Sequence, residues 1–542
     1  MTELSSTKIP STEVQEAYLK LGMVLRQSGD HSEACRVLRR AIRRDPGSAS
    51  AHLALGMTLM DIPNYHGAAR VLRQAAKLAA PHDKETMGAA NSSLALAQLY
   101  LGRPRAFLKA FQQARKCGGE SAELCNVVGG IMAQTGRYDE ALPAFNRALE
   151  LEPESASALT NRGETYREMG RYDEALTDFN RALELEPENI RIRLNRALIL
   201  QDMSRYEEAL IDFARANEME PENALVFSAR ASTYERMGRY DEALHDLGRA
   251  IRLDPDFVSS WGVRGSIYLR KKRYEEALGD FSRTIDLWPN SFLPLSSRGV
   301  TYHAMSRYDE ALIDFNRALE LEPENASVLD NRGLTYHAMS RYDEALIDFN
   351  RALELEPENA SVLENRGLTY HAMGRYDEAL IDFSHALELG TDNAFALGGR
   401  GETYLKMGRY EKAIEDFNQA IEIESEDDWN WYMRAITYAA QGKEDQAKSD
   451  LNTALSLAQQ RHAKNPRYWH GSLNLVLYCV AAGEMAQAQK YYQEAIGAKV
   501  SSHIIRESIK DLEDFLTLFP DHPQAQAMKE LLQSHLPHRL GT

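Results

Sequence analysis

Three histidines at one fixed spacing are the first residues with the chemistry of a metal site or a pH-sensitive surface. They are His303, His337 and His371, each 34 residues after the one before. A metal ion needs its ligands within a few ångströms of one point. On equivalent helices of stacked repeats, these histidines would be about two interhelical spacings of 8–10 Å apart. We therefore predict no metal site, and a groove surface that changes charge in mild acid stays open.

The sequence lacks the motifs of the common catalytic and cofactor-binding sites. It has no glycine-rich phosphate loop, no zinc-ligand spacing, no G-x-S-x-G elbow and no H-E-x-x-H motif. Its many histidines and carboxylates form no constellation beyond what the repeat itself explains. We predict that the protein is not an enzyme and that it needs no cofactor.

A row of asparagines at a second repeated position has the chemistry of peptide binding. An asparagine amide offers a donor and an acceptor, so a row of them can pair with the backbone of an extended peptide. The alternative is that they are solvated polar residues near helix starts. The members of the row are Asn161, Asn195, Asn331, Asn365 and Asn474. It is interrupted at Ala229, Val263, Ser297, Gly399 and Met433.

Arginine and aspartate occur together in nine repeats, which predicts ion pairing. In each of these repeats the aspartate follows the arginine by 16 residues, as in Arg332 with Asp348 and Arg366 with Asp382. The other five repeats lack both residues. Pairing between repeats would leave an unmatched residue at each end of the row, so we predict a bidentate bridge within each repeat. The alternative, an arginine row that binds an acidic ligand, is weakened by the aspartates that would neutralise it.

The elements that must position these residues follow a 34-residue period. The segment Gly-Arg-Tyr-Asp-Glu-Ala-Leu begins at Gly136 and recurs at Gly170 and Gly238, with variants on the same grid. Within one period, apolar and small residues recur at three- and four-residue spacing in two runs, which predicts two helices. A turn near Ser340 separates them in the repeat that starts at Ala326. A fixed period of this length indicates a repeat architecture.

The repeat resembles the tetratricopeptide repeat family. The resemblance rests on small and aromatic residues at fixed positions of the two helices and on a proline that follows the second helix. In the repeat that starts at Ala326 these residues are Gly333, Tyr336, Ala345, Phe349, Ala352 and Pro357. It implies an all-α fold, a right-handed α–α superhelix of helix–turn–helix repeats whose first helices line a concave groove. The asparagine row looks like the asparagine ladder in the repeats of O-linked N-acetylglucosamine transferase. By this resemblance the candidate groove residues are the five asparagines, the three histidines, Glu164, Arg167 and Glu402.

Extending the register predicts 14 repeats. Residues 1–14 form an N-terminal segment, and residues 15–121 hold three divergent repeats with an insertion at 83–87. Residues 122–461 hold ten regular repeats. Residues 462–502 hold a second insertion, at 462–468, and a divergent last repeat. Residues 503–542 are predicted to form capping helices and a tail, because a terminal repeat must cover its apolar face. The repeats are predicted to start at Gln15, Ala49, Gly88, Ala122, Ala156, Ile190, Ala224, Val258, Phe292, Ala326, Ala360, Ala394, Asp428 and Trp469.

Charge and composition narrow the class of partner. With 80 acidic and 63 basic residues, the net charge is −17, which argues against binding nucleic acid or an anionic membrane surface. No run of about 18 apolar residues predicts a membrane span, and Met1 to Ser11 show no signal core. The four cysteines are too sparse for a disulfide framework, which fits a reducing compartment. We expect a cytoplasmic protein that binds a protein or peptide, with self-association possible.

The predicted function is a non-catalytic scaffold or adaptor whose concave groove binds an extended peptide or a partner helix. The alternative is a regulatory subunit whose superhelix couples partner binding to the activity of an associated enzyme. The C-terminal quarter is rich in aromatic residues, which favours a core there over an interface. These aromatic residues are Trp429, Trp431, Tyr432, Tyr468, Trp469, Tyr491 and Tyr492.

Overall fold

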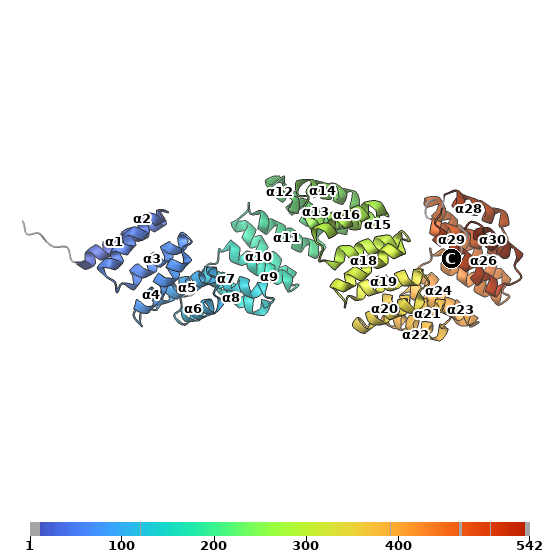
Figure 1. Ribbon diagram of the computed structural model, residues 1–542, viewed down its shortest axis with the longest axis horizontal. Coiled ribbons are helices and arrows are strands. Elements are labelled where there is room, and N and C mark those ends of the chain that lie inside the picture. The colour runs from blue at the N-terminus through green and yellow to red at the C-terminus, as the bar shows by residue number, and fades with distance from the viewer. Residues whose placement is uncertain (1–10, 120, 391, 466–468, 499, 537–542) are drawn as a thin grey trace, which may run out of the picture. The chain divides into compact units, whose positions relative to one another are not determined.

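The protein is described by a computed structural model in which every regular element is a helix. The structure describes residues 11–119, 121–390, 392–465, 469–498 and 500–536. Thirty helices and no strands occur in these residues (Figure 1). The predicted all-α class and the 34-residue helix pairs are confirmed. None of the described helices is both long enough and apolar enough to cross a membrane.

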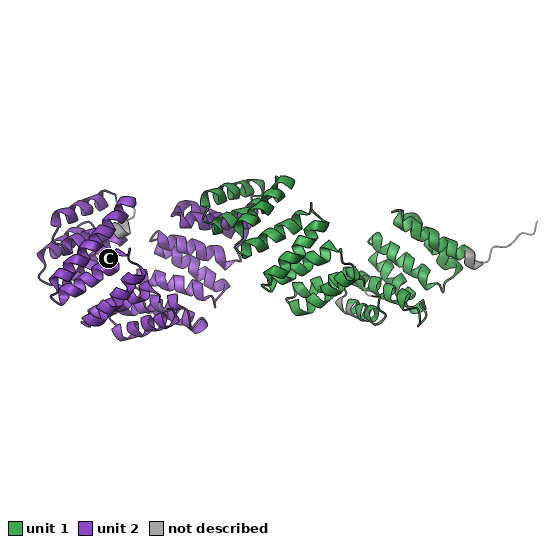
Figure 2. Ribbon diagram, turned by 180° about the vertical axis from the view of Figure 1, so that it is seen from behind, with its two compact units in different colours: residues 1–254 green, residues 255–542 purple. Residues whose placement is uncertain are grey.

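The chain divides into two compact units, residues 1–254 and 255–542 (Figure 2). The helices of the first unit are α1 (Ser11–Gln27), α2 (His31–Arg44), α3 (Ala49–Asp61), α4 (Tyr65–Leu78), α5 (Lys84–Tyr100), α6 (Pro104–Lys116), α7 (Ala122–Gln134), α8 (Tyr138–Leu151), α9 (Ala156–Glu168), α10 (Tyr172–Leu185), α11 (Ile190–Asp202), α12 (Tyr206–Met219), α13 (Ala224–Arg236) and α14 (Tyr240–Leu253). Odd-numbered helices are the first helices of their repeats, and even-numbered helices are the second.

The second unit continues the same alternation as far as α28 and then adds two helices. Its helices are α15 (Val258–Arg270), α16 (Tyr274–Leu287), α17 (Phe292–Ala304), α18 (Tyr308–Leu321), α19 (Ala326–Ala338), α20 (Tyr342–Leu355), α21 (Ala360–Ala372), α22 (Tyr376–Leu389), α23 (Ala394–Lys406), α24 (Tyr410–Ile423), α25 (Asp428–Ala440), α26 (Glu444–Lys464), α27 (Trp469–Ala481), α28 (Met485–Gly497), α29 (Ser502–Leu518) and α30 (Pro523–Gln533).

The first helices begin at the predicted residue in every repeat but two. Helix α1 begins at Ser11 rather than Gln15, and α5 begins at Lys84 rather than Gly88. The segment 83–87, interpreted as an insertion, is therefore an extra first turn of α5. Asp83 makes this possible, because its carboxylate accepts a hydrogen bond from the Thr86 amide and caps the lengthened helix.

The second predicted insertion is partly helical as well. Helix α26 has 21 residues, against 14 for the second helix of a regular repeat such as α24, because it continues through His462 to Lys464. Residues 466–468 of this segment lie outside the described residues. The last repeat resumes on the predicted register at Trp469.

Close packing of a glycine against an aromatic ring joins the two helices of a repeat. A Cβ atom at Gly333 would lie 2.6 Å from Phe349 Cε1, so only glycine lets α19 approach α20 this closely. Phe349 and the two alanines of α20, Ala345 and Ala352, are fully buried. The turn between the helices holds Ser340 at φ 59°, in the left-handed region where Gly374 stands in the next repeat.

The two final helices pack on the end of the last repeat. Ile505, Ile509 and Leu512 of α29 share one apolar core with α27. Helix α30 contributes Met528 and Leu532, both fully buried. Apolar residues of α27 are thereby covered, as hydrophobic burial requires at the end of a repeat array.

Candidate functional site

The paired arginine and aspartate of each repeat meet in bidentate contact. Arg332 Nε donates to Asp348 Oδ2 at 2.7 Å, and Arg332 Nη2 donates to Asp348 Oδ1 at 2.6 Å. The aspartate is buried, and its hydrogen bonds raise the pKa of the arginine. The same geometry recurs in Arg162–Asp178, Arg196–Asp212, Arg230–Asp246, Arg264–Asp280, Arg298–Asp314, Arg366–Asp382, Arg400–Asp416 and Arg434–Asp450.

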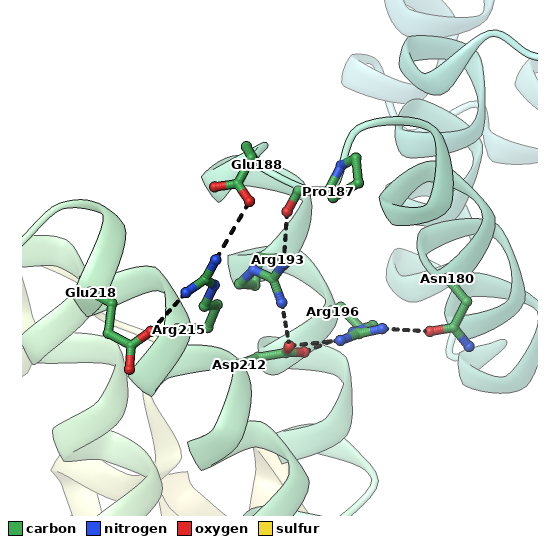
Figure 3. Close-up of polar contacts among 8 residues, drawn as sticks. All are labelled: Asn180, Pro187, Glu188, Arg193, Arg196, Asp212, Arg215 and Glu218. Atoms are coloured by element: carbon green, nitrogen blue, oxygen red, sulfur yellow. Dashed lines mark hydrogen bonds and ion pairs between the residues drawn. The ribbon is translucent and has the colours of Figure 1, made fainter.

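A third hydrogen bond from the arginine reaches the preceding repeat, which sequence reasoning missed. Figure 3 shows Arg196 Nη1 donating to Asn180 Oδ1 of α10 at 2.9 Å while Arg196 also holds Asp212. Arg193 adds a contact of 3.3 Å to Asp212 Oδ1 (Figure 3). The sequence feature that could have predicted this bond is an asparagine or serine 16 residues before the arginine. In the described residues these partners are Asn146, Asn180, Ser282, Asn316, Asn350, Ser384 and Asn418.

Repeats without the ion pair carry apolar residues at the same two places. Leu55 of α3 is buried where an arginine stands elsewhere, and Val71 occupies the place of the aspartate on α4. In the bridged repeats Nε and Nη2 of the guanidinium are committed to the aspartate. The bridge therefore joins helices within the scaffold, and it leaves little of the arginine to bind an acidic ligand.

The first helices of the C-terminal unit and α29 line a cavity of about 630 Å³ that is partly open to solvent. Four of the candidate groove residues lie around it: His337, His371, Glu402 and Asn474. Helix α25 supplies an aromatic wall through Trp429. We call the face of the first helices that carries these residues the inner face; it is the face that the resemblance to the repeat family assigns to a groove.

Helix α29 lines one side of this cavity and meets the repeats through side-chain contacts near both of its ends. At its start, His503 Nε2 is 3.0 Å from the hydroxyl of Tyr308 on α18. Near its end, Lys406 Nζ of α23 donates to Asp514 Oδ1 at 2.6 Å and to Thr517 Oγ1 at 3.4 Å. The contacts join residues about 100 to 200 positions apart in the chain. Sequence reasoning predicted the helix as a cap but had no signal for these contacts.

The three histidines link neighbouring first helices rather than standing free. Thr369 Oγ1 donates to the carbonyl of Asn365 at 2.8 Å and lies 2.9 Å from His337 Nδ1. Because the threonine proton is already used, Nδ1 must carry the proton and donate. Burial accordingly lowers the pKa of His337 and of His371 to about 4, which keeps both rings neutral. His303 and His371 contact Thr335 and Thr403 in the same way.

Carboxyl groups on the inner face of the C-terminal unit have neutral partners. Asp330 accepts from Asn365 at 2.9 Å, Glu364 from Asn393 at 2.5 Å, and Glu402 from Trp429 Nε1 at 2.5 Å. Burial raises the pKa of all three, that of Glu402 to about 7. Across the cavity, burial and the neighbouring Asp514 raise the pKa of Asp511 to about 7. Asparagine Asn331 donates to the Ser327 carbonyl of its own helix at 2.9 Å.

The candidate residues of the N-terminal unit have side-chain partners on neighbouring first helices. Asn195 donates to Glu164 Oε1 at 2.6 Å, and Arg191 Nη2 donates to the same oxygen at 2.8 Å. Arg167 Nε meets Asp202 Oδ2 at 3.0 Å. Asn161 donates to Asn126 at 2.9 Å. Here the charges on the first helices are matched by opposite charges on the same face.

The aromatic C-terminal quarter is both core and cavity wall. Tyr432 and Tyr478 are buried and stacked at 4.7 Å between ring centroids, and Tyr492 is fully buried. Asp428 is buried as well, with Tyr478 and Arg461 as partners. Trp429 faces the cavity. The side chains of Tyr468 and Trp469 lie outside the described residues.

Metal and thiol chemistry gain no support from the described residues. Among them, no group of three or more histidine, cysteine, aspartate or glutamate side chains could hold a metal ion. The four cysteines are thiols rather than disulfides, and burial raises the pKa of Cys479 to about 12.

Comparison with known families gives matches over more than half of the chain. Family models described as "Tetratricopeptide repeat" or "TPR repeat" match residues 19–83, 120–188, 154–216, 228–292, 294–325, 333–374, 358–425 and 404–469. No curated protein matches the sequence.

Three solved structures are among those that match this chain. The APC/C hetero-tetramer Cut9–Hcn1 gives a TM-score of 0.42 at 14% identity, over 78% of this chain and 96% of that one. A tetratricopeptide repeat protein from Parabacteroides merdae gives 0.39 at 21% identity, over 46% and 98%. YrrB, described as a TPR protein with an unusual peptide-binding site, gives 0.30 at 24% identity, over 34% and 95%.

Proposed function

The chain belongs to the tetratricopeptide repeat family, whose repeats imply protein–protein interaction, and we propose on this basis that it is a non-catalytic scaffold. The scaffold holds a segment of a partner protein against the inner faces of its first helices. The segment is an extended peptide or a helix. The bridged arginines and aspartates hold the helix pairs together, and the first helices present the polar and aromatic side chains that contact the partner.

One observation carries this proposal: a helix already lies on the inner face of the C-terminal unit. Helix α29 contacts Tyr308 at one end and Lys406 at the other. The cavity beside it is lined by first-helix residues such as His371, Glu402 and Trp429. A surface that accommodates a helix of its own chain has the width and the mixed polar and apolar character that a partner helix needs.

The N-terminal unit supports the extended-peptide form of the proposal. Its asparagines Asn161 and Asn195 lie on neighbouring first helices and already exchange hydrogen bonds with side chains of adjacent repeats. A peptide backbone would replace these side-chain partners with its own amides and carbonyls. The likeness of this row to the asparagine ladder of O-linked N-acetylglucosamine transferase belongs to the same proposal.

Site-specific photo-cross-linking in the native cell tests the proposed binding surface. A photoreactive residue replaces Asn195 or Glu164 on the inner face, and in matched controls it replaces Ile211 or Ile347, which are exposed on second helices. We expect partner peptides to be cross-linked from the inner positions and not from the controls. Cross-links confined to the second-helix positions, or none from any position, would overturn the proposal. A single enzyme recovered as partner would instead support the regulatory-subunit alternative.

A further inference from the structure

The face of α29 that meets the inner face is unlike its opposite face. Ile505, Ile509 and Leu512 pack in the apolar core with α27. Glu507, Asp511 and Asp514, at spacings of four and three residues, point toward the first helices and line the cavity. Helix α29 thus turns to the repeats a face on which these three carboxylates and Lys510 stand among apolar side chains such as Ile504 and Phe515.

The inner face that α29 covers is itself acidic. Asp330 on α19, Glu364 on α21 and Glu402 on α23 have no cation at ion-pair distance within the described residues. The histidines between them, His337 and His371, are neutral. The charges that α29 brings are Glu507, Lys510, Asp511 and Asp514, and the ion pair across the interface is Lys406–Asp514.

Asp511 marks the poorest match between the two surfaces. It has no hydrogen-bond or ion-pair partner in the described part of the chain, and burial, together with the nearby carboxylates of Asp514 and Glu402, raises its pKa to about 7. Like charges that face one another across a half-buried interface are destabilising. A cation in place of Asp511 would be attracted by both carboxylates.

The space left beside α29 also shows an incomplete fit. The cavity measures about 630 Å³ and is partly open to solvent, so α29 leaves part of the inner face uncovered. It is nevertheless too small for a second helix. A helix with side chains is about 10 Å across, so the cavity would hold about five residues of one. A partner helix can therefore use this surface only where α29 leaves it.

We propose that the inner face of the C-terminal unit is the receptor for an amphipathic partner helix that carries lysine or arginine where α29 carries Asp511, and that α29 is an internal occupant which this helix displaces. The inference rests on the proposed scaffold function and deepens it. The partner helix repeats the apolar positions of Ile505, Ile509 and Leu512, so it covers the core that α29 uncovers. Its cation replaces the repulsion between Asp511 and Glu402 by attraction.

A labelled peptide of residues 502–518 provides the probe, in its natural form and with Asp511→Lys. Fluorescence anisotropy measures the binding of each peptide to the full chain. We expect the Asp511→Lys peptide to bind at least 10-fold more tightly than the natural peptide. Glu402→Gln in the full chain should remove most of this difference, because the interaction depends on the Glu402 carboxylate. Equal binding of the two peptides, or a difference that Glu402→Gln leaves unchanged, would overturn the inference.

Displacement is tested in the full chain by loosening α29. Asp514→Lys breaks the Lys406–Asp514 ion pair, so the Asp511→Lys peptide should bind several-fold more tightly to this variant, and α29 should exchange its amide hydrogens faster. Glu513→Lys is the control: it makes the same charge change on the same helix, but the ion pair it breaks is with Lys529 of α30 and not with the inner face. Unchanged binding and exchange in Asp514→Lys would contradict displacement.

The outcomes also separate this inference from the proposed function. Cross-links from Asn195 without peptide binding to the C-terminal unit would retain the scaffold function and overturn the receptor. Peptide binding that meets the charge criteria, without any cross-link in the cell, would retain the receptor and overturn the scaffold function.

Discussion

The inner faces of the two units are built on the same repeat, yet they differ in how their carboxylates are neutralised. Glu164 and Glu402 occupy the same position in their first helices. Each accepts a hydrogen bond from the residue that lies 27 positions later in the chain. In the N-terminal unit it is Arg191, whose guanidinium lies 2.8 Å from Glu164. In the C-terminal unit it is Trp429, whose indole is a neutral donor 2.5 Å from Glu402.

One repeat position thus sets the electrostatics of the face without altering the scaffold. An ion pair satisfies Glu164, so the N-terminal face has little to gain from an added cation. Glu402 has a neutral donor in place of a paired cation, and burial raises its pKa although Trp429 and the more distant Lys406 act against the rise. The C-terminal face is the one that an added cation would stabilise, and it is the one that α29 covers.

The comparison assumes that the two units have equivalent scaffolds. Breaking the arginine–aspartate bridge in each unit tests this assumption, and we expect it to have the largest effect on stability. Arg332→Leu leaves Asp348 buried without its cation and should cost about 3–5 kcal/mol of local stability. Arg162→Leu should cost a similar amount in the N-terminal unit, because Asp178 is equally buried. Hydrogen exchange of α19, α20, α9 and α10 reports each loss locally, as a repeat array requires.

The second member of the pair supplies the control. Arg332→Leu with Asp348→Val copies the apolar pair Leu55 and Val71 of α3 and α4 and should recover most of the loss. Equal damage in the single and the double variant would show that the aspartate is not what the arginine neutralises.

A second difference between the units is acid sensitivity. His337 and His371 have pKa values of about 4 when folded, below their ordinary value of 6.5, so the unfolded chain binds more protons between these pH values. Their contribution to stability is complete above pH 6.5 and falls as the pH drops toward 4. His337→Gln with His371→Gln should therefore reduce the acid lability of the C-terminal unit, with a Tm at pH 5 several degrees above that of the unaltered chain.

The N-terminal unit contains the precedent for this substitution. Gln201 stands at the equivalent place and accepts a hydrogen bond from Thr233 at 3.2 Å, so glutamine keeps the link to the next repeat. Glu402 and Asp511 act in the opposite direction, because their raised pKa values favour the folded state in acid. Both carboxyl groups are present in the unaltered protein and in the variant, so they do not contribute to the difference in Tm between the two. Parallel pH profiles of Tm in the two chains would contradict the assignment.

The sequence was sufficient for the fold because the repeat supplies the same local signals many times. Gly333, Phe349 and Pro357 recur in register, so the starts of the first helices were predicted to the residue in most repeats. Asp83 shows the limit of this reasoning, because an added turn with its own cap looks like an insertion in a one-dimensional register.

The candidate site was predictable only in part. The groove positions follow from the repeat, and His337, His371, Glu402 and Asn474 do lie around one cavity. The path of α29 does not follow, because its contacts with Tyr308 and Lys406 join segments that no periodicity relates. The tautomer of the histidines likewise depends on threonines of the next repeat, a pairing that the sequence does not display.

The charge comparison itself can be tested with one substitution in each unit. Because the folded-state pKa of Glu402 is about 7, against an ordinary 4.5, its stabilising contribution is complete below pH 4.5 and is lost as the pH rises through 7. Glu402→Gln should therefore raise Tm by about 1–3 °C at pH 8 and should change it little at pH 4.5. Glu164→Gln removes an exposed ion pair and should lower stability by less than about 1 kcal/mol. Changes of the same sign at pH 8 would remove the distinction between the faces.

The smallest expected effect comes from the bond between consecutive repeats. Asn350→Ala removes the hydrogen bond from Arg366 Nη1 at 2.7 Å but leaves both bonds of Arg366 to Asp382 intact. Ala214 stands at this place before Arg230, and the Arg230–Asp246 bridge forms without a third bond. Because the contact is exposed, we expect a loss of about 0.5–1 kcal/mol, and a similar loss for Asn180→Ala in the N-terminal unit. Hydrogen exchange measured at increasing urea concentrations should resolve this loss of stability. A loss as large as that of Arg332→Leu would mean that the bridge depends on the neighbouring repeat. The two units could then not be compared repeat by repeat.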